Sequence, residues 1–304
     1  MRKRFLVFTL TVLSIVLSQA QADSKTSPEI VVSIAPIHSL VTGVMEGVGE
    51  PRLLIQSTAS PHHFSLRPSH MKALGKAQLV VRIGEDFERF LNRPLAHLGT
   101  NTRLLNIIEL PDIERLPYRD MDAHSSHHHD QPVDPHVWLD PNNAQVIVKA
   151  VVALLSEIDA VNKVVYQTNG QRMLQDLQAL DKHLTLILND INKKPYLVLH
   201  DAYYYFEKHY QLNQVGAVSV SPERRPGARR LSQIRKKAAK ESVSCIFGEP
   251  QMPAKYLEGI AEDAGLKLGV LDPLGVGLKE DQTLYFQMMN RLAESLVNCL
   301  QTKL

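Results

Sequence analysis

The sequence predicts an α/β protein of two lobes, each with a four-stranded parallel sheet and flanking helices, joined by a long linker helix. Three observations support this fold class. Short β-rich runs alternate with helical stretches, which is typical of parallel sheets, and they form two separate series. A long helical pattern lies between the series. The chain has 304 residues, of which 44% are hydrophobic and 22% charged, so it can bury two packed cores.

The N-terminus, residues 1–22, has the pattern of a secretory signal peptide. Basic residues Arg2 to Arg4 precede an apolar run from Phe5 to Leu17, and Ala20-Gln21-Ala22 forms a small-residue cleavage site. The apolar run of about 13 residues is shorter than the roughly 20 that a membrane-spanning helix needs. We therefore expect cleavage after Ala22 and an exported, soluble product that does not insert into the membrane. The first cysteine is Cys245, so no cysteine near the leader is available for a lipid anchor.

Charge and composition exclude several classes of protein. Without the three basic residues of the leader, the 34 Lys and Arg fall to 34 − 3 = 31, against 32 Asp and Glu. Such a balance does not predict a nucleic-acid-binding surface. Two cysteines are too few for a disulfide-built scaffold or a cysteine-rich zinc module, whereas 13 histidines are more than usual for this length. Histidine is therefore the residue type that says most about the function.

The first lobe is predicted to comprise residues 23–158. Its strand-like runs are 30–34, 52–56, 78–83 and 103–107. Pro111 to Pro135 has no apolar periodicity and is expected to form a surface loop, whose residues from about 120 to 131 are rich in histidine. A helical stretch from Pro141 to about Ile158 completes this lobe.

The linker helix is predicted over residues 159–192. Leucine and isoleucine recur there at three- and four-residue steps, and no proline occurs from Val161 to Ile191. A helix of about 30 residues would be roughly 45 Å long, enough to extend along both lobes. The alternative is two shorter helices broken near Asn169-Gly170.

The second lobe is predicted to comprise residues 193–304. Its strand-like runs are 196–200, 214–220, 243–247 and 266–271. Cys245 lies in one of these strands, and Cys299 lies near the end of the final helix. An oxidising compartment makes this pair a disulfide candidate, and the alternative is two buried free thiols.

Four candidate metal ligands lie at or just after predicted strand ends: His62, His136, His200 and Asp272. Ligands of open parallel sheets bind outside the carboxyl ends of the strands. Two of these residues belong to each lobe, so we expect a site in the cleft between the lobes. Three neutral imidazoles and a carboxylate form a donor set that suits Zn²⁺. A single histidine at a strand end is more often a capping or surface residue, and His63 could replace its neighbour His62.

Several residue strings resemble the periplasmic metal-binding proteins of ABC importers, and most closely the high-affinity zinc-uptake group, the ZnuA family. They are Ser65-Leu66-Arg67-Pro68-Ser69, Asp134-Pro135-His136-Val137-Trp138-Leu139-Asp140-Pro141, His200-Asp201-Ala202-Tyr203, Gly248-Glu249-Pro250-Gln251 and Leu271-Asp272-Pro273-Leu274-Gly275. The resemblance implies two four-stranded lobes, a long connecting helix and zinc held in the cleft. It also implies His62, His136 and His200 as ligands, Asp272 as a possible fourth ligand, and a Cys245–Cys299 disulfide.

Two comparisons with the family pattern bear on the metal. Zinc members often have a glutamate before the first histidine, whereas this chain has Pro61 there, which strengthens the case for Asp272 or water in the fourth position. Manganese members have a carboxylate where His200 stands. Because hard Mn²⁺ prefers oxygen ligands, three nitrogens favour zinc, although copper or nickel could bind the same nitrogens.

The histidine-rich loop contains His124, His127, His128 and His129. It resembles a loop of the zinc members, although it is short. We interpret it as an accessory zinc-capturing segment, and the alternative is a solvated polar loop.

The sequence thus predicts a monomeric binding protein that captures Zn²⁺ and hands it to an inner-membrane ABC transporter permease, without catalysing a reaction. Two alternatives remain. One is a secreted zinc hydrolase, which would need an open coordination position on the metal; no His-Glu-x-x-His helix is present. The other is a manganese or other-metal binding protein, or a metal-dependent adhesin, of the same fold.

Overall fold

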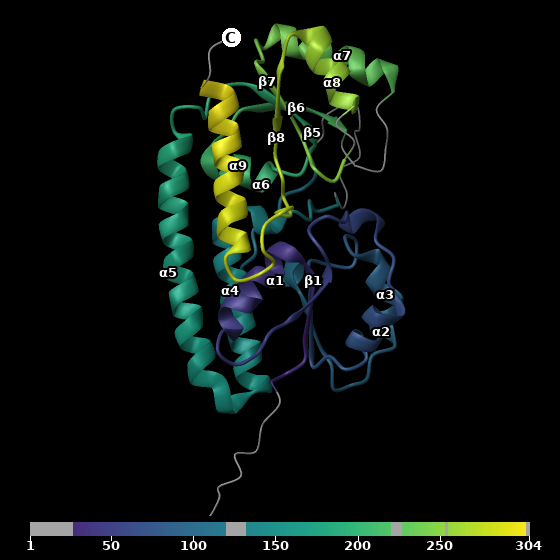
Figure 1. Cartoon of the computed structure of the whole chain (residues 1–304), viewed down its shortest axis with the longest axis vertical. Helices are drawn as coiled ribbons and strands as arrows, with labels where there is room; N and C mark the ends of the chain where they lie inside the picture. The colour runs from purple at the N-terminus through teal and green to yellow at the C-terminus, as the bar shows by residue number, and fades with distance from the viewer. Residues whose placement is uncertain (1–26, 120–131, 220–226, 253–254, 302–304) are drawn as a thin grey trace, which may run out of the picture.

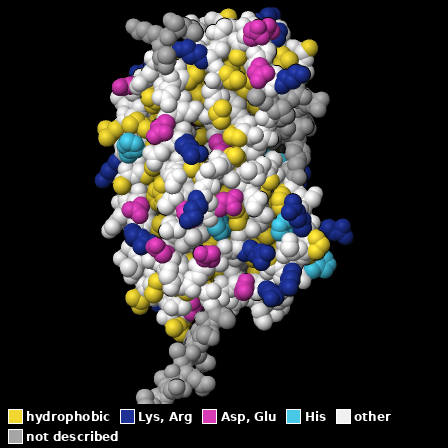
Figure 2. Space-filling view, viewed as in Figure 1, with side chains coloured by type: hydrophobic (Ala, Val, Ile, Leu, Met, Phe, Trp, Pro, Cys, Tyr) yellow, Lys and Arg dark blue, Asp and Glu magenta, His cyan; other side chains and the backbone are white. Residues whose placement is uncertain are grey.

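A computed structural model describes residues 27–119, 132–219, 227–252 and 255–301. The predicted signal peptide and the histidine-rich loop lie outside these residues. Two sheets follow one another along the long axis of the molecule, and long helices run beside them (Figure 1). Among the described residues, no helix is both long and apolar enough to cross a membrane. Acidic and basic side chains are interspersed over the described part of the face shown in Figure 2.

The first sheet has four parallel strands in the order β2-β1-β3-β4. They are β1 (Ile30–Ile34), β2 (Arg52–Ile55), β3 (Leu79–Arg82) and β4 (Arg103–Asn106). All five residues of the central strand β1 are buried, as expected of a parallel strand covered by helices on both faces. Those helices are α1 (Ala35–Met45), α2 (Pro68–Leu74), α3 (Arg89–Ala96) and α4 (Pro141–Ile158). We call this unit the first lobe.

The second sheet has four parallel strands in the order β6-β5-β7-β8. They are β5 (Tyr196–His200), β6 (Gln214–Ser219), β7 (Cys245–Gly248) and β8 (Lys267–Val270). Helices α7 (Ala228–Lys240) and α8 (Lys255–Ala264) pack on it. Helix α6 (Tyr204–Tyr210) follows β5 and bonds to it through Glu207, which accepts from the hydroxyl of Tyr196. We call this unit the second lobe. Every strand predicted from the sequence is present, with ends that differ by no more than two residues. The predicted fold class is confirmed.

The predicted linker is one continuous helix, α5 (Lys163–Leu188), preceded by a single turn, η4 (Ala160–Asn162). The alternative of a break near Gly170 is wrong. A Cβ atom on Gly170 would lie 2.4 Å from Cγ2 of Val152 on α4, so glycine is needed for close packing between the two helices. The amide of Asn169 donates to the backbone carbonyls of Val44 and Glu46. Both residues serve packing, although their types suggested a helix end.

Helix α9 (Leu284–Gln301) returns from the second sheet and packs along α5 and α1 (Figure 1). The backbone N–H of Tyr285 donates to Oγ of Ser39 at 3.0 Å, and its hydroxyl donates to the carbonyl of Trp138 at 2.8 Å. The indole of Trp138 in turn donates to the carbonyl of Pro273 at 3.0 Å. One hydrophobic core extends without interruption from β1 to β7.

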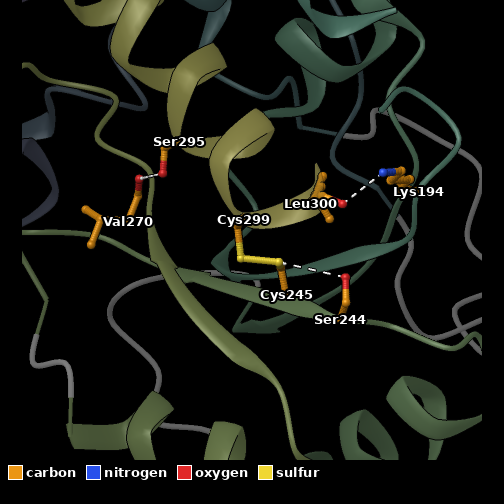
Figure 3. Close-up of a disulfide and its surroundings, with 7 residues drawn as sticks. All are labelled: Lys194, Ser244, Cys245, Val270, Ser295, Cys299 and Leu300. Carbon is orange, nitrogen blue, oxygen red and sulfur yellow. Dashed lines mark hydrogen bonds between the residues drawn. A yellow bond between two sulfur atoms is a disulfide. The ribbon is translucent and has the colours of Figure 1, made fainter. Parts of the chain in front are cut away.

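The predicted Cys245–Cys299 disulfide is present and joins β7 to α9, with 6.2 Å between the Cα atoms (Figure 3). Two hydrogen bonds flank it. Ser295 donates to the carbonyl of Val270 at 2.6 Å, and Lys194 donates to the carbonyl of Leu300 at 2.9 Å. The last turns of α9 are therefore fixed to the second sheet.

The expectation of a surface loop over Pro111 to Pro135 is wrong for its described ends. Ile113, Leu116 and Asp134 are buried, and Pro117 pairs with Val133 in an isolated antiparallel bridge. We call residues 113–119 and 132–135 the loop stem. The stem is buried because it packs on α6 of the second lobe: Tyr205 accepts from the Leu116 N–H and donates to the Asp134 carbonyl.

Candidate metal centre

The imidazoles of His62, His136 and His200 converge between the two lobes. Each ring offers one nitrogen, and these three nitrogens lie within 4.8 Å of one another. The ring centroids are 5.1 Å apart for His136 and His200, 5.6 Å for His62 and His200, and 6.0 Å for His62 and His136. The first lobe supplies two rings and the second lobe supplies one. The structure thus brings together three of the four residues singled out in the sequence.

Each histidine lies in a different kind of local structure. His200 is the last residue of β5. His62 lies in a one-turn helix after β2, η1 (Pro61–His63), in which Pro61 occupies the first helical position. His136 precedes another short helix, η3 (Val137–Leu139), and not the end of a sheet strand. The expectation of a strand end is therefore wrong at His136, where the isolated bridge of Val133 takes the place of a strand.

Each of the two buried histidines has a carboxylate on its Nδ1 atom. Oδ1 of Asp134 lies 2.6 Å from Nδ1 of His136 and also accepts the backbone N–H of His136 at 3.0 Å. Oε1 of Glu249 lies 3.1 Å from Nδ1 of His200 and accepts the hydroxyl of Tyr203 at 3.2 Å. The remaining nitrogen of each ring is Nε2. Carboxylate partners of this kind fix the tautomer and orientation of metal-binding imidazoles and raise their basicity.

Charge around His200 favours a cation. Burial by itself would lower the pKa of His200, but the carboxylates of Glu249, Asp134 and Asp201 outweigh burial and raise it. The same negative charges attract a metal cation, which competes with the proton for the neutral ring.

The three histidines border a small pocket that is partly open to solvent. Its other walls are mainly apolar, from Pro61, Phe87, Trp138, Met252, Pro273 and Leu274. The ring of His62 meets Phe87 edge-on at 5.1 Å, and the ring of His136 lies 5.3 Å from Trp138. Tight packing limits the rotation of these imidazoles, which lowers the entropy lost when they bind an ion.

Asp272 lies outside the group of three ring nitrogens. Its Oδ1 accepts from Nε2 of Gln251 at 2.9 Å and from the Leu274 N–H at 3.0 Å, and its Oδ2 accepts from the Val276 N–H. These bonds hold the loop after β8. Asp272 as a fourth metal ligand therefore stays a prediction, and ligation would draw on an oxygen that already accepts hydrogen bonds.

Two further histidines have polar partners that explain their positions. Nε2 of His38 contacts the carbonyl of Pro51 at 2.9 Å, and His209 lies between Asp140 and Asp181, so both are structural. The accessory candidates His124, His127, His128 and His129 lie outside the described residues, and so does the side chain of His63.

Sequence reasoning did not assign a role to Asp134 or Glu249, although both occur in the strings that it singled out. The contact of Asp134 with His136 could have been predicted from the sequence, because a carboxylate two residues before a histidine can reach its ring. For Glu249 the signal was weaker: it directly follows β7, which pairs with the strand that carries His200.

Comparison with known proteins identifies the family. Residues 30–299 match the family model described as "ZnuA: Zinc-uptake complex component A periplasmic". The chain belongs to this family. The "High-affinity zinc uptake system protein ZnuA" of Brucella abortus is 34% identical, over 89% of this chain and 91% of that protein. A crystal structure of ZnuA superposes with a TM-score of 0.78 at 25% identity, over 90% of this chain and 99% of that one.

A further solved structure shows that the fold is not restricted to one metal. FpvC of Pseudomonas aeruginosa, in complex with Mn²⁺, has a TM-score of 0.79 at 22% identity and covers 91% of this chain and 99% of its own. At this identity the likeness concerns the fold alone.

As a member of the ZnuA family, this chain is a periplasmic, metal-binding solute-binding protein of a transport system. The family's role is binding and transport, and its members are not enzymes. The alternative of a secreted hydrolase is therefore wrong.

Proposed function

We propose that the chain captures Zn²⁺ in the pocket of His62, His136 and His200 and delivers it to an inner-membrane ABC transporter permease for import. The convergence of three imidazole nitrogens carries this proposal. Zinc–nitrogen bonds of about 2.0–2.1 Å in a tetrahedron place the ligand nitrogens about 3.3 Å apart. Small rotations of the three rings would bring nitrogens within 4.8 Å of one another to that spacing.

The donor set supports zinc over manganese. All three members of the group are imidazoles, and Mn²⁺ prefers hard oxygen ligands. The fourth position is taken by water or by Asp272. Copper and nickel would also bind three imidazoles in vitro, so competition among Zn²⁺, Mn²⁺, Ni²⁺ and Cu²⁺ tests the metal directly.

Removal of one ligand tests the site. We expect His136→Ala and His200→Ala, in the mature chain purified without a histidine tag, to weaken Zn²⁺ binding by more than about 100-fold. This exceeds the usual effect of removing a partner that only orients a ligand. His183→Ala, at an exposed position of α5, is the control and should bind as the wild type does. Competition with a chromophoric chelator measures the affinities, and wild-type affinity in both ligand variants would disprove the site.

Delivery is tested in the bacterium that encodes the chain. A strain without the chain should grow poorly when zinc is limiting, and recover with the wild-type chain but not with the His200→Ala chain. Equal recovery with both chains would contradict the role in zinc import.

A further inference from the structure

A buried ion cluster joins the two lobes beside the metal centre, and zinc ligation does not account for it. Arg119 lies in the loop stem of the first lobe, and its partners Asp201 and Glu207 belong to the second lobe. The side chains are 19%, 2% and 3% exposed, respectively. Removing three charges from water is costly, so such a cluster is a weak source of stability. We therefore expect the cluster to serve mainly to hold these side chains, and the two lobes that carry them, in a fixed relative position.

The guanidinium of Arg119 determines the orientation of Asp201. Its Nη2 contacts Oδ1 of Asp201, and its Nε donates to Oδ2 at 3.2 Å, so the contact uses both carboxylate oxygens. Nη2 also lies 2.6 Å from Oε2 of Glu207, and the guanidinium lies 4.5 Å from the ring centroid of Tyr204. A planar guanidinium that contacts both oxygens of a carboxylate fixes its orientation more tightly than the ammonium group of a lysine does.

Asp201 directly follows His200, the imidazole that the second lobe contributes to the metal centre. The N–H of Ala202 donates to the carbonyl of His200 at 3.0 Å, so the chain turns tightly at this point. Asp201 therefore lies inside the tight turn that carries His200. Glu249 holds the ring of His200 from the other side.

We propose that Arg119 is a positioning residue for the metal centre: by fixing Asp201 from the first lobe, it holds His200 in register with His62 and His136. The inference rests on the proposed function, because it concerns the same site. Without the guanidinium, Asp201 would lose the two contacts from the first lobe that fix both of its carboxylate oxygens. The second lobe's ligand would then lose its fixed distance from the other two.

A matched pair of variants separates positioning from stability. Asp201→Asn and Glu207→Gln each remove one carboxylate beside Arg119, but only Asp201 adjoins His200. Arg119→Met removes the guanidinium, and Arg119→Lys keeps the charge without the fork. Chelator competition gives the Zn²⁺ affinity, and the visible spectrum of the Co²⁺ form reports the coordination geometry. Far-UV circular dichroism verifies the fold of each variant.

We expect Arg119→Met and Asp201→Asn to bind Zn²⁺ about 10-fold or more weakly and to change the Co²⁺ spectrum, the usual range for partners that orient a metal ligand. Glu207→Gln should keep the wild-type spectrum, and Arg119→Lys should be intermediate. If Arg119→Met does not fold, Asp201→Asn decides. Wild-type affinity and spectrum in Asp201→Asn, or an equal loss in Glu207→Gln, overturns the inference. Failure of the wild-type chain to bind zinc overturns the proposed function instead.

Discussion

Single residues set the chemistry of the metal centre through pairs of a carboxylate and an imidazole. Asp134 and Glu249 each hold the Nδ1 atom of one buried ring, at 2.6 and 3.1 Å. Two histidines supplied by different lobes are thus oriented by residues of their own lobe. A cation that arrives needs to reorganise little, which favours tight binding.

Loss of either carboxylate partner should weaken zinc binding. Asp134→Asn and Glu249→Gln keep the size of the side chain but remove its charge, so each ring loses the partner that fixes its tautomer and orientation. We expect 10- to 100-fold weaker binding of Zn²⁺ in each, measured by chelator competition. Glu114→Gln, which removes an exposed carboxylate of the loop stem, is the control. Unchanged affinity in both test variants would show that the partners have no role in binding.

The candidate ligands could be predicted from the sequence because three histidines and a carboxylate, two from each predicted lobe, together form a donor set that suits zinc. Their partners were harder to predict. Asp134 is two residues from its histidine, whereas Glu249 is 49 residues from His200 and reaches it only because β5 and β7 are neighbours in the sheet. Nothing in the sequence near Arg119 indicates its role, because its two partners, Asp201 and Glu207, lie 82 and 88 positions further along the chain.

At the scale of elements, strands and helices follow the local pattern of the sequence, and exceptions occur where packing overrides it. Glycine inside α5 suggested a helix end, yet the nearest atom of Val152 fills the space where a Cβ would lie. The loop stem lacked any apolar period, yet contacts with α6 bury it. In both cases the deciding partner is remote in sequence.

Gly170→Ala should destabilise the protein, although alanine favours helices. The added Cβ would lie 2.4 Å from Cγ2 of Val152, and overpacking of this kind costs about 1–3 kcal/mol. Gly259→Ala, also within a helix, is the matched control, because no atom lies within 4 Å of its added Cβ. That variant should gain up to about 1 kcal/mol. Urea denaturation measures both, and a gain of stability in Gly170→Ala would contradict the packing argument.

At the scale of the whole molecule, α6 connects the second lobe to the first at several points. One of them is His209, whose Nδ1 lies 3.2 Å from Asp140 at the start of α4 and whose Nε2 lies 2.7 Å from Asp181 on α5. Partial burial by itself would lower the pKa of His209, but hydrogen bonds to Asp140 and Asp181 outweigh it and raise the pKa to about 8.

The raised pKa makes this connection dependent on pH. The protonated ring is favoured in the folded state, so its stabilisation is fully present below the ordinary pKa of about 6.5 and is lost as pH rises through about 8. After allowance for solvent screening, the effect is about 1 kcal/mol. We expect the stability difference between wild type and His209→Gln, from urea denaturation of metal-free protein, to be smaller at pH 9 than at pH 6. An equal difference at both pH values would rule out this linkage.

The path of α9 has a consequence for the order in which the chain can fold. This helix follows the second sheet in sequence, yet its apolar face covers α1 and α5, and Tyr285 bonds to Ser39 in the first lobe. A chain that emerges N-terminus first therefore presents α1 long before its cover exists. Until residues 284–301 have emerged, the apolar surface of the first lobe stays open to water, to chaperones and to other unfinished chains. Completion of the first lobe depends on the arrival of α9.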